Sequence, residues 1–465
     1  MSTATKILPS RLADIAGPAQ VSNDPAELGA YSVDGKIPSA AVRPGSTGEV
    51  VEIMKFAAAE KLAVIASGAR TKLNMGLPPR RYDLALDMTR LDRVVACDPG
   101  DLTVALEAGI PLKKLARVLA EHKQFLPLAV PYFDRATVGG TIASGVDTPL
   151  RQFYGTARDY LLGAEYVTGE GVLAKSGGRV VKNVTGYDLH KLMIGSLGTL
   201  GVVLRINFRT FTLPENSRAF VALFESAGRA LDMRHRMAQS SLTPSTLDVF
   251  SPSVADLLSS DVAARYGTGA YPADLLSNKN WALTTGYAGN DKVLARYTAE
   301  LSRMAQEAGA VRVKELGSEE VPPAFSRKRE FIPIALESSP ATTILKISVL
   351  PMRMKEMLEA AGRIADNNSV PWAAMARGLG VILVALLPAE KNEDWRRRVT
   401  HAADQTITAC GSLEGNATVP WCPSEWKSTM KIWGLERADV AQMQKVKRVF
   451  DPAGVLSPGR FMGGL

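Results

Sequence analysis

Glycine recurs along residues 177–203, whose sequence is GGRVVKNVTGYDLHKLMIGSLGTLGVV and whose only acid is Asp188. Glycine loses more backbone entropy on folding than any other residue, so dense use of it indicates unusual dihedral angles or close approach by another group. The segment also lacks the alternation of a half-buried strand. It therefore predicts a wall of backbone that lies close against a flat ligand.

The rest of the composition describes a large, mildly basic globular chain. With 465 residues, 46% of them hydrophobic, it can bury two or three cores. Its formal net charge is +8, but the basic clusters are short and lack interleaved aromatic residues. A nucleic-acid groove needs a continuous basic track with stacking platforms, so we interpret these clusters as solvated faces and expect no nucleic-acid partner. The charge suits an anionic substrate, an anionic cofactor or an acidic partner protein.

Cysteine usage and hydropathy bear on the compartment. Cys97, Cys410 and Cys422 are far apart and show no Cys-x-x-Cys spacing, which favours a reduced cytoplasmic setting without a zinc or iron–sulfur site. The first residues have no apolar stretch long enough for a signal peptide. The longest apolar run, Val381–Leu387, is far short of the ~20 residues that cross a bilayer. We expect membrane contact to be peripheral at most, at the inner face.

Local patterns predict where one key loop begins. Ser46 and Glu49 form a capping-box pattern, and Val50 starts an apolar series at helical spacing. The run Leu62–Ser67 predicts a short buried strand, followed at once by the loop Gly68–Gly76, whose free N–H groups suit an anion. Further strands are expected at 83–88, 103–108, 163–168, 202–211, 219–224, 246–250, 281–287, 345–350 and 381–387, with helices at 112–122, 291–308 and 352–367.

Three glycine-rich loops lie in the N-terminal half: 67–76, 136–145 and 177–203. None ends in Gly-Lys-Ser/Thr, so magnesium nucleotide hydrolysis is disfavoured. None shows Gly-x-Gly-x-x-Gly between a strand and a helix, so a nicotinamide Rossmann site is not indicated either. Taken singly, each loop is more simply explained as a turn-rich structural segment.

Taken together, the loops stand in the order and spacing of a known family. The motifs are Ser67–Leu73, Thr137–Gly140, Tyr154–Asp159, Lys182–Asp188 and Gly198–Val203. In combination they resemble the FAD-binding domain of the p-cresol methylhydroxylase/vanillyl-alcohol oxidase superfamily. VVKNVTGYDLHKLMIGSLGTLGVV and the ending DPAGVLSPGRFMGGL make the chain most similar to the second FAD-binding subunit of glycolate oxidase (glycolate dehydrogenase) complexes.

The resemblance implies an α+β architecture: a two-subdomain FAD-binding fold of the p-cresol methylhydroxylase type with an α+β cap domain. The pattern of strands and helices after about residue 215 is typical of a separate domain. We expect an N-terminal lead segment over 1–38, the FAD-binding domain over 39–215, the cap or substrate domain over 216–414, and a return to the FAD-binding domain over 415–465.

The expected cofactor is FAD, held without a covalent bond, because Ser67–Leu73 contains no histidine that could tether it. Several backbone N–H groups around a pyrophosphate can hold it, since each hydrogen bond to a charged group contributes ~1.5–3 kcal/mol. The resemblance places Gly201–Val203 beside the adenine and Gly155–Arg158 along the ribose–flavin side. The full set of expected FAD contacts is Ser67, Gly68, Ala69, Arg70, Thr71, Lys72, Leu73, Thr137, Gly139, Gly140, Ser144, Gly145, Tyr154, Gly155, Arg158, Lys182, Asn183, Gly201, Val202 and Val203.

Catalytic residues are harder to find. Members of this superfamily that oxidise D-2-hydroxy acids hold a divalent metal through a His-x-His pair, whereas this chain has four widely separated histidines, so no metal is expected. Lys346, on a cap strand that should face the flavin, and Arg460, near the C-terminus, are the candidates for holding a substrate carboxylate. For both, an ordinary salt bridge or a solvated side chain is the alternative.

These expectations lead to three hypotheses. The first is an FAD-binding subunit of a 2-hydroxy-acid (glycolate or D-lactate) dehydrogenase complex, which carries or supports electron transfer with a catalytic flavin subunit and an iron–sulfur subunit as partners. The second is a self-sufficient FAD-dependent hydroxy-acid or alcohol dehydrogenase. The third is a structural subunit with a vestigial flavin pocket.

Overall fold

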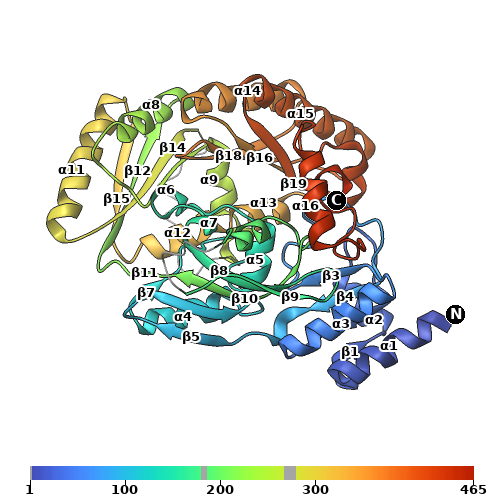
Figure 1. The fold of residues 1–465 in the computed structure, drawn as a ribbon. Helices are drawn as coiled ribbons and strands as arrows, with labels where there is room; N and C mark the ends of the chain where they lie inside the picture. Colours follow the sequence, from blue (N-terminus) through green and yellow to red (C-terminus); the bar gives the residue numbers. More distant parts are fainter. Residues whose placement is uncertain (1–2, 180–185, 267–278) are drawn as a thin grey trace.

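The computed structural model describes residues 3–179, 186–266 and 279–465. Figure 1 shows the small sheets of the N-terminal half on one side of the molecule and one large, helix-covered sheet on the other. The expected strands and helices form close to their predicted positions, and the sheets combine into the α+β architecture that the sequence predicted.

The first sheet has four strands in the order β1-β2-β4-β3, and the last three are parallel. Helix α3 (Thr47–Ala59) connects β2 to β3, and the predicted capping box starts it, because the Ser46 side chain accepts the N–H of Glu49 at 3.2 Å. The apolar residues of its inner face are fully buried against the sheet. The strands are β1 (Val21–Ser22), β2 (Ala40–Val42), β3 (Val64–Ser67) and β4 (Leu84–Asp87).

The second sheet is antiparallel, with five strands in the order β5-β6-β10-β8-β9, and a two-stranded sheet, β11-β7, lies beside it. Its core contains α4 (Leu112–Glu121), whose Leu112, Leu115 and Leu119 are buried as the predicted amphipathic helix requires. The strands are β5 (Val94–Asp98), β6 (Thr103–Glu107), β7 (Gln124–Phe125), β8 (Leu161–Val167), β9 (Leu173–Gly177), β10 (Val202–Arg209) and β11 (Phe211–Thr212).

The large sheet has eight antiparallel strands in the order β15-β12-β14-β13-β17-β18-β16-β19. Its central strands are buried on both faces, which explains the continuous apolar run of Val381–Leu386. The strands are β12 (Ser217–Phe224), β13 (Thr246–Phe250), β14 (Trp281–Ala288), β15 (Arg312–Leu316), β16 (Thr343–Ser348), β17 (Trp372–Arg377), β18 (Val381–Leu386) and β19 (Asn416–Trp421).

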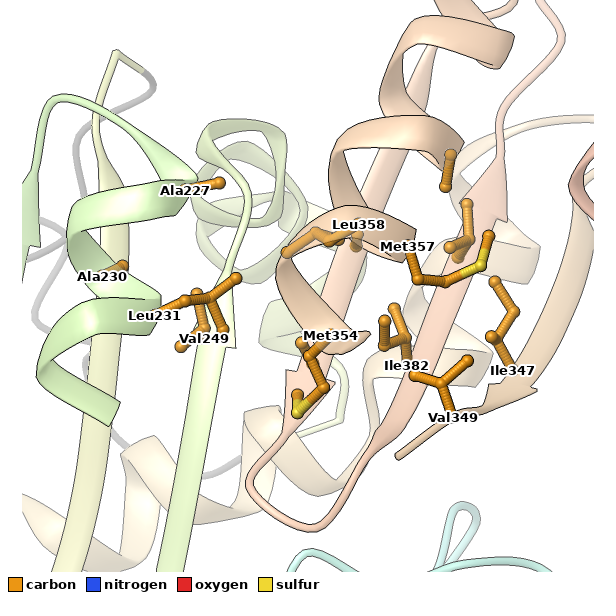
Figure 2. Close-up of a cluster of buried hydrophobic side chains, with 14 of the residues drawn as sticks. Ala227, Ala230, Leu231, Val249, Ile347, Val349, Met354, Met357, Leu358 and Ile382 are labelled. Carbon is orange, nitrogen blue, oxygen red and sulfur yellow. The ribbon is translucent and has the colours of Figure 1, made fainter. Parts of the chain in front are cut away.

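Two layers of helices cover this sheet. Its outer face packs against α8 (Ala227–Ala238), α11 (Asp291–Glu307), α14 (Met354–Asn367) and α15 (Glu393–Ser412), which Figure 1 shows along the rim of the molecule. Figure 2 shows side chains of α8 and α14 meeting Val249, Ile347 and Ile382 of the strands. The inner face packs against α9 (Pro252–Ser259), α12 (Val321–Arg329) and α13 (Phe331–Ser338).

The C-terminal segment connects the two halves. Strand β19 closes one edge of the large sheet, and Leu456 then pairs with Val64 at the edge of the first sheet. Lys447 fixes this return by donating to the carbonyls of Thr199 (2.7 Å) and Leu456 (2.9 Å). The remaining helices are α1 (Thr3–Ala16), α2 (Pro25–Leu28), α5 (Val138–Ser144), α6 (Arg151–Tyr154), α7 (Ala157–Tyr160), α10 (Asp261–Ala264) and α16 (Val440–Phe450). Within the described part of the chain, no helix is both long and apolar enough to span a membrane.

Candidate functional site

The loop after β3 is held in an uncommon backbone conformation. Arg70 adopts a φ of 60°, in the left-handed region that few residues other than glycine occupy. Its guanidinium lies 2.7 Å from the buried carboxylate of Asp87 and 4.6 Å from the centroid of the Tyr31 ring. These contacts hold the Arg70 side chain in place beside the cavity that the loop borders.

Helix α5 lies against the inner side of this loop. Its N-cap residue, Thr137, accepts the N–H of Gly140 at 3.3 Å. A Cβ atom on Gly68 would lie 2.0 Å from the Thr137 hydroxyl, so only glycine allows this approach. A Cβ on Gly140 would lie 3.1 Å from the same hydroxyl, and outside its own helix no other described atom lies within 4 Å. Gly140 therefore borders open space, whereas Gly68 packs against protein.

The open space is a series of three cavities that share walls, which we call the trough. Two cavities of about 60 Å³ share Ser67, Gly68, Thr137, Gly140 and Leu197. The third, of about 250 Å³, shares Ser144 and Leu197 with the first and extends under the large sheet. The trough thus brings together many predicted contacts: Ser67, Gly68, Ala69, Arg70, Thr71, Lys72, Leu73, Thr137, Gly139, Gly140, Ser144, Gly145, Gly201, Val202 and Val203.

The glycine-rich residues 195–203 form one wall of the trough. A Cβ on Gly145, at the end of α5, would lie 2.8 Å from the Cα atom of Gly195, so the two backbones meet directly. Leu197 contacts all three cavities, and Gly201 lines the far one. Part of the glycine content therefore serves packing between chain segments, and part of it lines the trough.

The middle of the trough carries unbalanced positive charge. Burial lowers the pKa of the Lys72 ammonium to about 8, although the Glu330 carboxylate opposes this shift. The carboxylate of Glu330 is engaged elsewhere: it accepts the N–H groups of Tyr132 and Phe133 and pairs with Arg329. The Ser67 hydroxyl, at the end of β3, is buried and has no partner among the described residues. Both groups suit an anion with several oxygen atoms.

Arg460 also lines this part of the trough, but it holds the loop. Its guanidinium donates to the backbone carbonyls of Leu73 and Met75 and is 3% exposed. Lys427 holds the same loop, because its ammonium group donates to the backbone carbonyls of Asn74 and Gly76. The structure therefore does not bring the two predicted catalytic residues together: Arg460 supports the loop after β3, while Lys346 lines the cavity under the sheet.

The cavity under the sheet contains a cluster of charged residues. Asp147 accepts Arg377 at 2.5 Å and Arg151 at 3.0 Å. Burial opposes ionisation of Asp147, but the two arginines and Lys346 outweigh it and lower its pKa. Burial likewise lowers the pKa of Lys346, and the attraction of Asp147 opposes that. Three cations and one acid leave the cluster positive.

Arg377 and Asp147 were missed by the sequence reasoning. They stand 230 positions apart, and neither belongs to a motif. The only signal was a polar residue at the end of an otherwise apolar stretch, WAAMAR, which became strand β17. Trp433 also lines this cavity, with its indole N–H buried and unpartnered among the described residues.

Some predicted contacts lie elsewhere. Tyr154 lines a separate apolar cavity, with its ring centroid 5.2 Å from that of Phe125 and 5.0 Å from that of Phe211. Gly155, with a φ of 77°, forms the turn before α7, and Arg158 is exposed on α7. The predicted contacts Lys182 and Asn183 lie outside the described residues.

None of the four histidines lines the trough. His190 is buried, and its Nδ1 lies 3.0 Å from the Ser176 hydroxyl, away from the trough. His122, His235 and His401 are exposed. Over residues 3–179, 186–266 and 279–465, no group of three or more His, Cys, Asp or Glu side chains is placed to hold a metal ion.

The fold and the trough define a protein with a series of connected cavities, lined by glycines and basic side chains, between two small sheets and a cap. Two family models match it: an FAD binding domain over residues 38–177, and the C-terminal domain of FAD linked oxidases over residues 213–418 and 433–461. The chain belongs to the FAD-linked oxidase family. It is an FAD-dependent oxidoreductase, and FAD is its cofactor.

The chain is also similar to individual proteins and to a solved structure. The chain is 25% identical over 463 residues to the glycolate oxidase subunit GlcD of Bacillus subtilis (strain 168), covering 98% of this chain and 97% of that protein. It is 34% identical over 169 residues to the glycolate oxidase subunit GlcE of Escherichia coli (strain K12), covering 36% and 48%. The crystal structure of p-cresol methylhydroxylase with substrate bound has the same fold, with a TM-score of 0.77, 16% identity, and coverage of 99% and 97%.

Proposed function

We propose that the chain is the FAD-carrying subunit of a 2-hydroxy-acid dehydrogenase complex, with FAD in the trough and the carboxylate of glycolate or D-lactate beside Lys346. The observation that carries the proposal is the positive cluster of Lys346, Arg377 and Arg151 around a single acid. A cavity that holds excess positive charge away from water is suited to an anionic ligand. The negative charge of the ligand stabilises the cations in place of the water that burial removes.

The trough suits FAD in several respects. Backbone N–H groups of the Gly68–Leu73 loop and the cation of Lys72 face a cavity where a pyrophosphate would be neutralised. The buried hydroxyl of Ser67 offers a donor that finds no acceptor in the described part of the chain. Gly140 leaves the space that a side chain would fill. Bound FAD would supply a hydride acceptor, which none of the protein side chains can provide.

The attachment is proposed to be non-covalent. The loop from Ser67 to Leu73 contains no histidine. Cys422 is buried, and burial raises its pKa to about 12, so its thiol is protonated at neutral pH. A protonated thiol is a poor nucleophile for attachment to an isoalloxazine ring.

Lys346 is proposed to bind the substrate carboxylate, and Arg377 to position it. No hydrogen-bond partner of the Lys346 ammonium occurs within the described ranges, so it is free to bind a ligand. Arg377 is held by Asp147, which fixes the guanidinium against the cavity wall. The interaction of a carboxylate with Lys346 then fixes the orientation of the substrate relative to the flavin without a metal ligand set.

The subunit role rests on likeness to two glycolate oxidase subunits, one along the whole chain and one along about a third of it. We infer a second flavin subunit and an iron–sulfur subunit as partners. Electrons would reach the iron–sulfur cluster either through the flavin of this chain or by a route that does not include it. The protein is proposed to act in the cytoplasm. A self-sufficient dehydrogenase is the second candidate, favoured by the presence of a complete cap cavity in this chain.

The test is an anaerobic titration of the purified yellow protein with glycolate and D-lactate, carried out on the chain alone and after co-expression with the proposed second flavin subunit and iron–sulfur subunit. We expect hydroxy acids to perturb the flavin spectrum in both preparations and to bleach it fully only in the complex. Full bleaching of the isolated chain would support the self-sufficient enzyme instead. Absence of any spectral change in the complete complex would contradict the assignment of the substrate class.

A further inference from the structure

A second cavity, of about 350 Å³, lies beneath the other half of the large sheet. It is enclosed by β12, β13 and β14 above, by α12 at one side, and by α6 and the chain around Leu213 below. Small-molecule sites in proteins range from ~300 to 1,000 Å³ and are mostly apolar with a few placed polar groups. The volume of this cavity falls within that range.

Its walls are apolar and its charges are balanced. Phe250, Phe325 and Tyr154 contribute aromatic surface. The two basic residues that line it are each paired with an acid: Lys328 lies 2.7 Å from the Asp248 carboxylate, and Arg218 pairs with Glu315. The side chains of the first pair are 8% and 0% exposed. A ligand here would meet no net charge, in contrast to the cluster around Lys346.

Two polar groups in the walls point to a ligand with a hydrogen-bond acceptor. The Thr284 hydroxyl is buried and has no partner among the described residues, which costs free energy unless a ligand or water satisfies it. The Lys328 ammonium donates one hydrogen bond, to Thr246 at 3.1 Å, and lies 2.7 Å from an Asp248 oxygen, so it has N–H capacity left for a ligand. Thr284 stands opposite Asp248 in the sheet, so both donors lie at one end of the cavity.

We propose that this cavity binds a neutral, mostly apolar molecule that carries a carbonyl group, with the carbonyl oxygen at Thr284 and Lys328 and an aromatic or aliphatic body against Phe250 and Phe325. A carboxylate of the same size is disfavoured, because Asp248 already neutralises Lys328 and a second anion would be buried without a counter-charge. This binding site is separate from the one proposed for the hydroxy acid.

The test is calorimetric titration of the FAD-loaded protein with three probes of one shape: 1-acetonaphthone, 1-naphthoate and 1-ethylnaphthalene. We expect saturable binding of the ketone, and binding about tenfold weaker for the hydrocarbon, which lacks the acceptor. The carboxylate should bind in the cavity around Lys346, so its binding should be lost in Lys346→Met while ketone binding remains. Comparing the two probes in Lys346→Met separates the two binding sites. Ketone binding tests the apolar cavity alone, so it can fail or succeed independently of the proposed function.

Two variants locate the ketone. Ala324→Trp fills the cavity from α12 and should weaken ketone binding by about tenfold or more, while the matched control Ala120→Trp, on the exposed side of α4, should leave it unchanged. Thr284→Val should remove the preference for the ketone over the hydrocarbon even if Ala324→Trp fails to fold. No saturable ketone binding to the wild type, equal binding to Ala324→Trp, or a persisting preference in Thr284→Val would overturn the proposal.

Discussion

Two cavities lie beneath the two halves of one sheet, and each has a lysine in its wall, but the two lysines differ in their partners. Lys328 lies 2.7 Å from Asp248, an acid to which no other cation of the described residues is paired. Lys346 faces Asp147, whose two oxygens are already taken by Arg377 and Arg151. The same residue type thus completes a neutral wall in one place and supplies a free positive charge in the other. The identity of the neighbours, rather than burial, decides which kind of ligand each cavity suits.

The two cavities are also neighbours through the sheet. Asp248 pairs across the strands with Thr284 of β14 on one side and with Arg377 of β17 on the other. These side chains therefore form a row that runs from the apolar cavity to the charged one. A substitution in this row changes the charge of one cavity or the other. Which cavity is changed depends on which charged side chain loses its counter-charge.

The largest effect is expected from Lys328→Met, which leaves the carboxylate of Asp248 buried without a partner. Removing one member of a buried ion pair costs about 3–5 kcal/mol of stability. The urea midpoint of the cap should fall accordingly, and Lys328→Met/Asp248→Leu should recover most of the loss. If the single variant were as stable as the wild type, Lys328 would not be the counter-charge that the structure indicates.

The next effect concerns the cofactor. Gly140→Val places a branched side chain in the open space of the trough, so the purified protein should lose its FAD absorbance while its circular dichroism spectrum is retained. Gly48→Val is the control: it also lies in a helix, where its Cβ would meet only the Ser46 hydroxyl at 3.9 Å. Wild-type flavin content in Gly140→Val would show that FAD does not lie against α5.

Lys346→Met sharpens the comparison with Lys328→Met most directly. Because Lys346 forms no ion pair or hydrogen bond among the described residues and attracts Asp147 only from a distance, stability should change much less than in Lys328→Met, whereas affinity for glycolate should fall by about 10- to 150-fold, the equivalent of one charged hydrogen bond. The measurement is the glycolate concentration that half-perturbs the flavin spectrum, with the exposed Lys391→Met as control. If Lys346→Met bound glycolate as tightly as Lys391→Met does, Lys346 would not belong to the proposed site.

The smallest effect is a pH dependence of FAD binding. Lys72 has a pKa of about 8 in the free protein, so above that pH it is neutral and must take up a proton before it can pair with a phosphate. The dissociation constant of FAD should therefore rise by up to about tenfold per pH unit above pH 8 and stay flat below it. Lys72→Arg, which remains charged, should abolish the slope, and a slope that survives in Lys72→Arg would exclude this residue as its source.

Patterns that are local in the sequence predicted much of this molecule. The capping box of Ser46, the strand before Ser67 and the apolar face of α4 all formed as expected, because each depends on residues within one turn or one strand. The loops that border the trough were found through their glycines and their family spacing. Lys346 was placed in the cap cavity because its strand was read correctly.

What the sequence did not predict depends on distant partners. Tyr154 stands in a family motif, yet its ring packs with Phe125 and Phe211 in the apolar cavity, since the short α6 turns it to that side. Strand β17, WAAMAR, is buried on both faces and so shows no alternation, which hid Arg377. The engagement of Arg460 with loop carbonyls likewise depends on a contact that spans 387 positions.

The support that Lys427 and Arg460 give to the loop after β3 has a consequence for biosynthesis. The carbonyls of Leu73, Asn74, Met75 and Gly76 all find their donors in these two side chains, which leave the ribosome last. Until Lys427 and Arg460 have been synthesised, the loop lacks the hydrogen bonds that these two side chains provide. We therefore expect the loop to gain this support only after the C-terminal segment has been made, and a chain truncated before Lys427 to bind FAD less tightly.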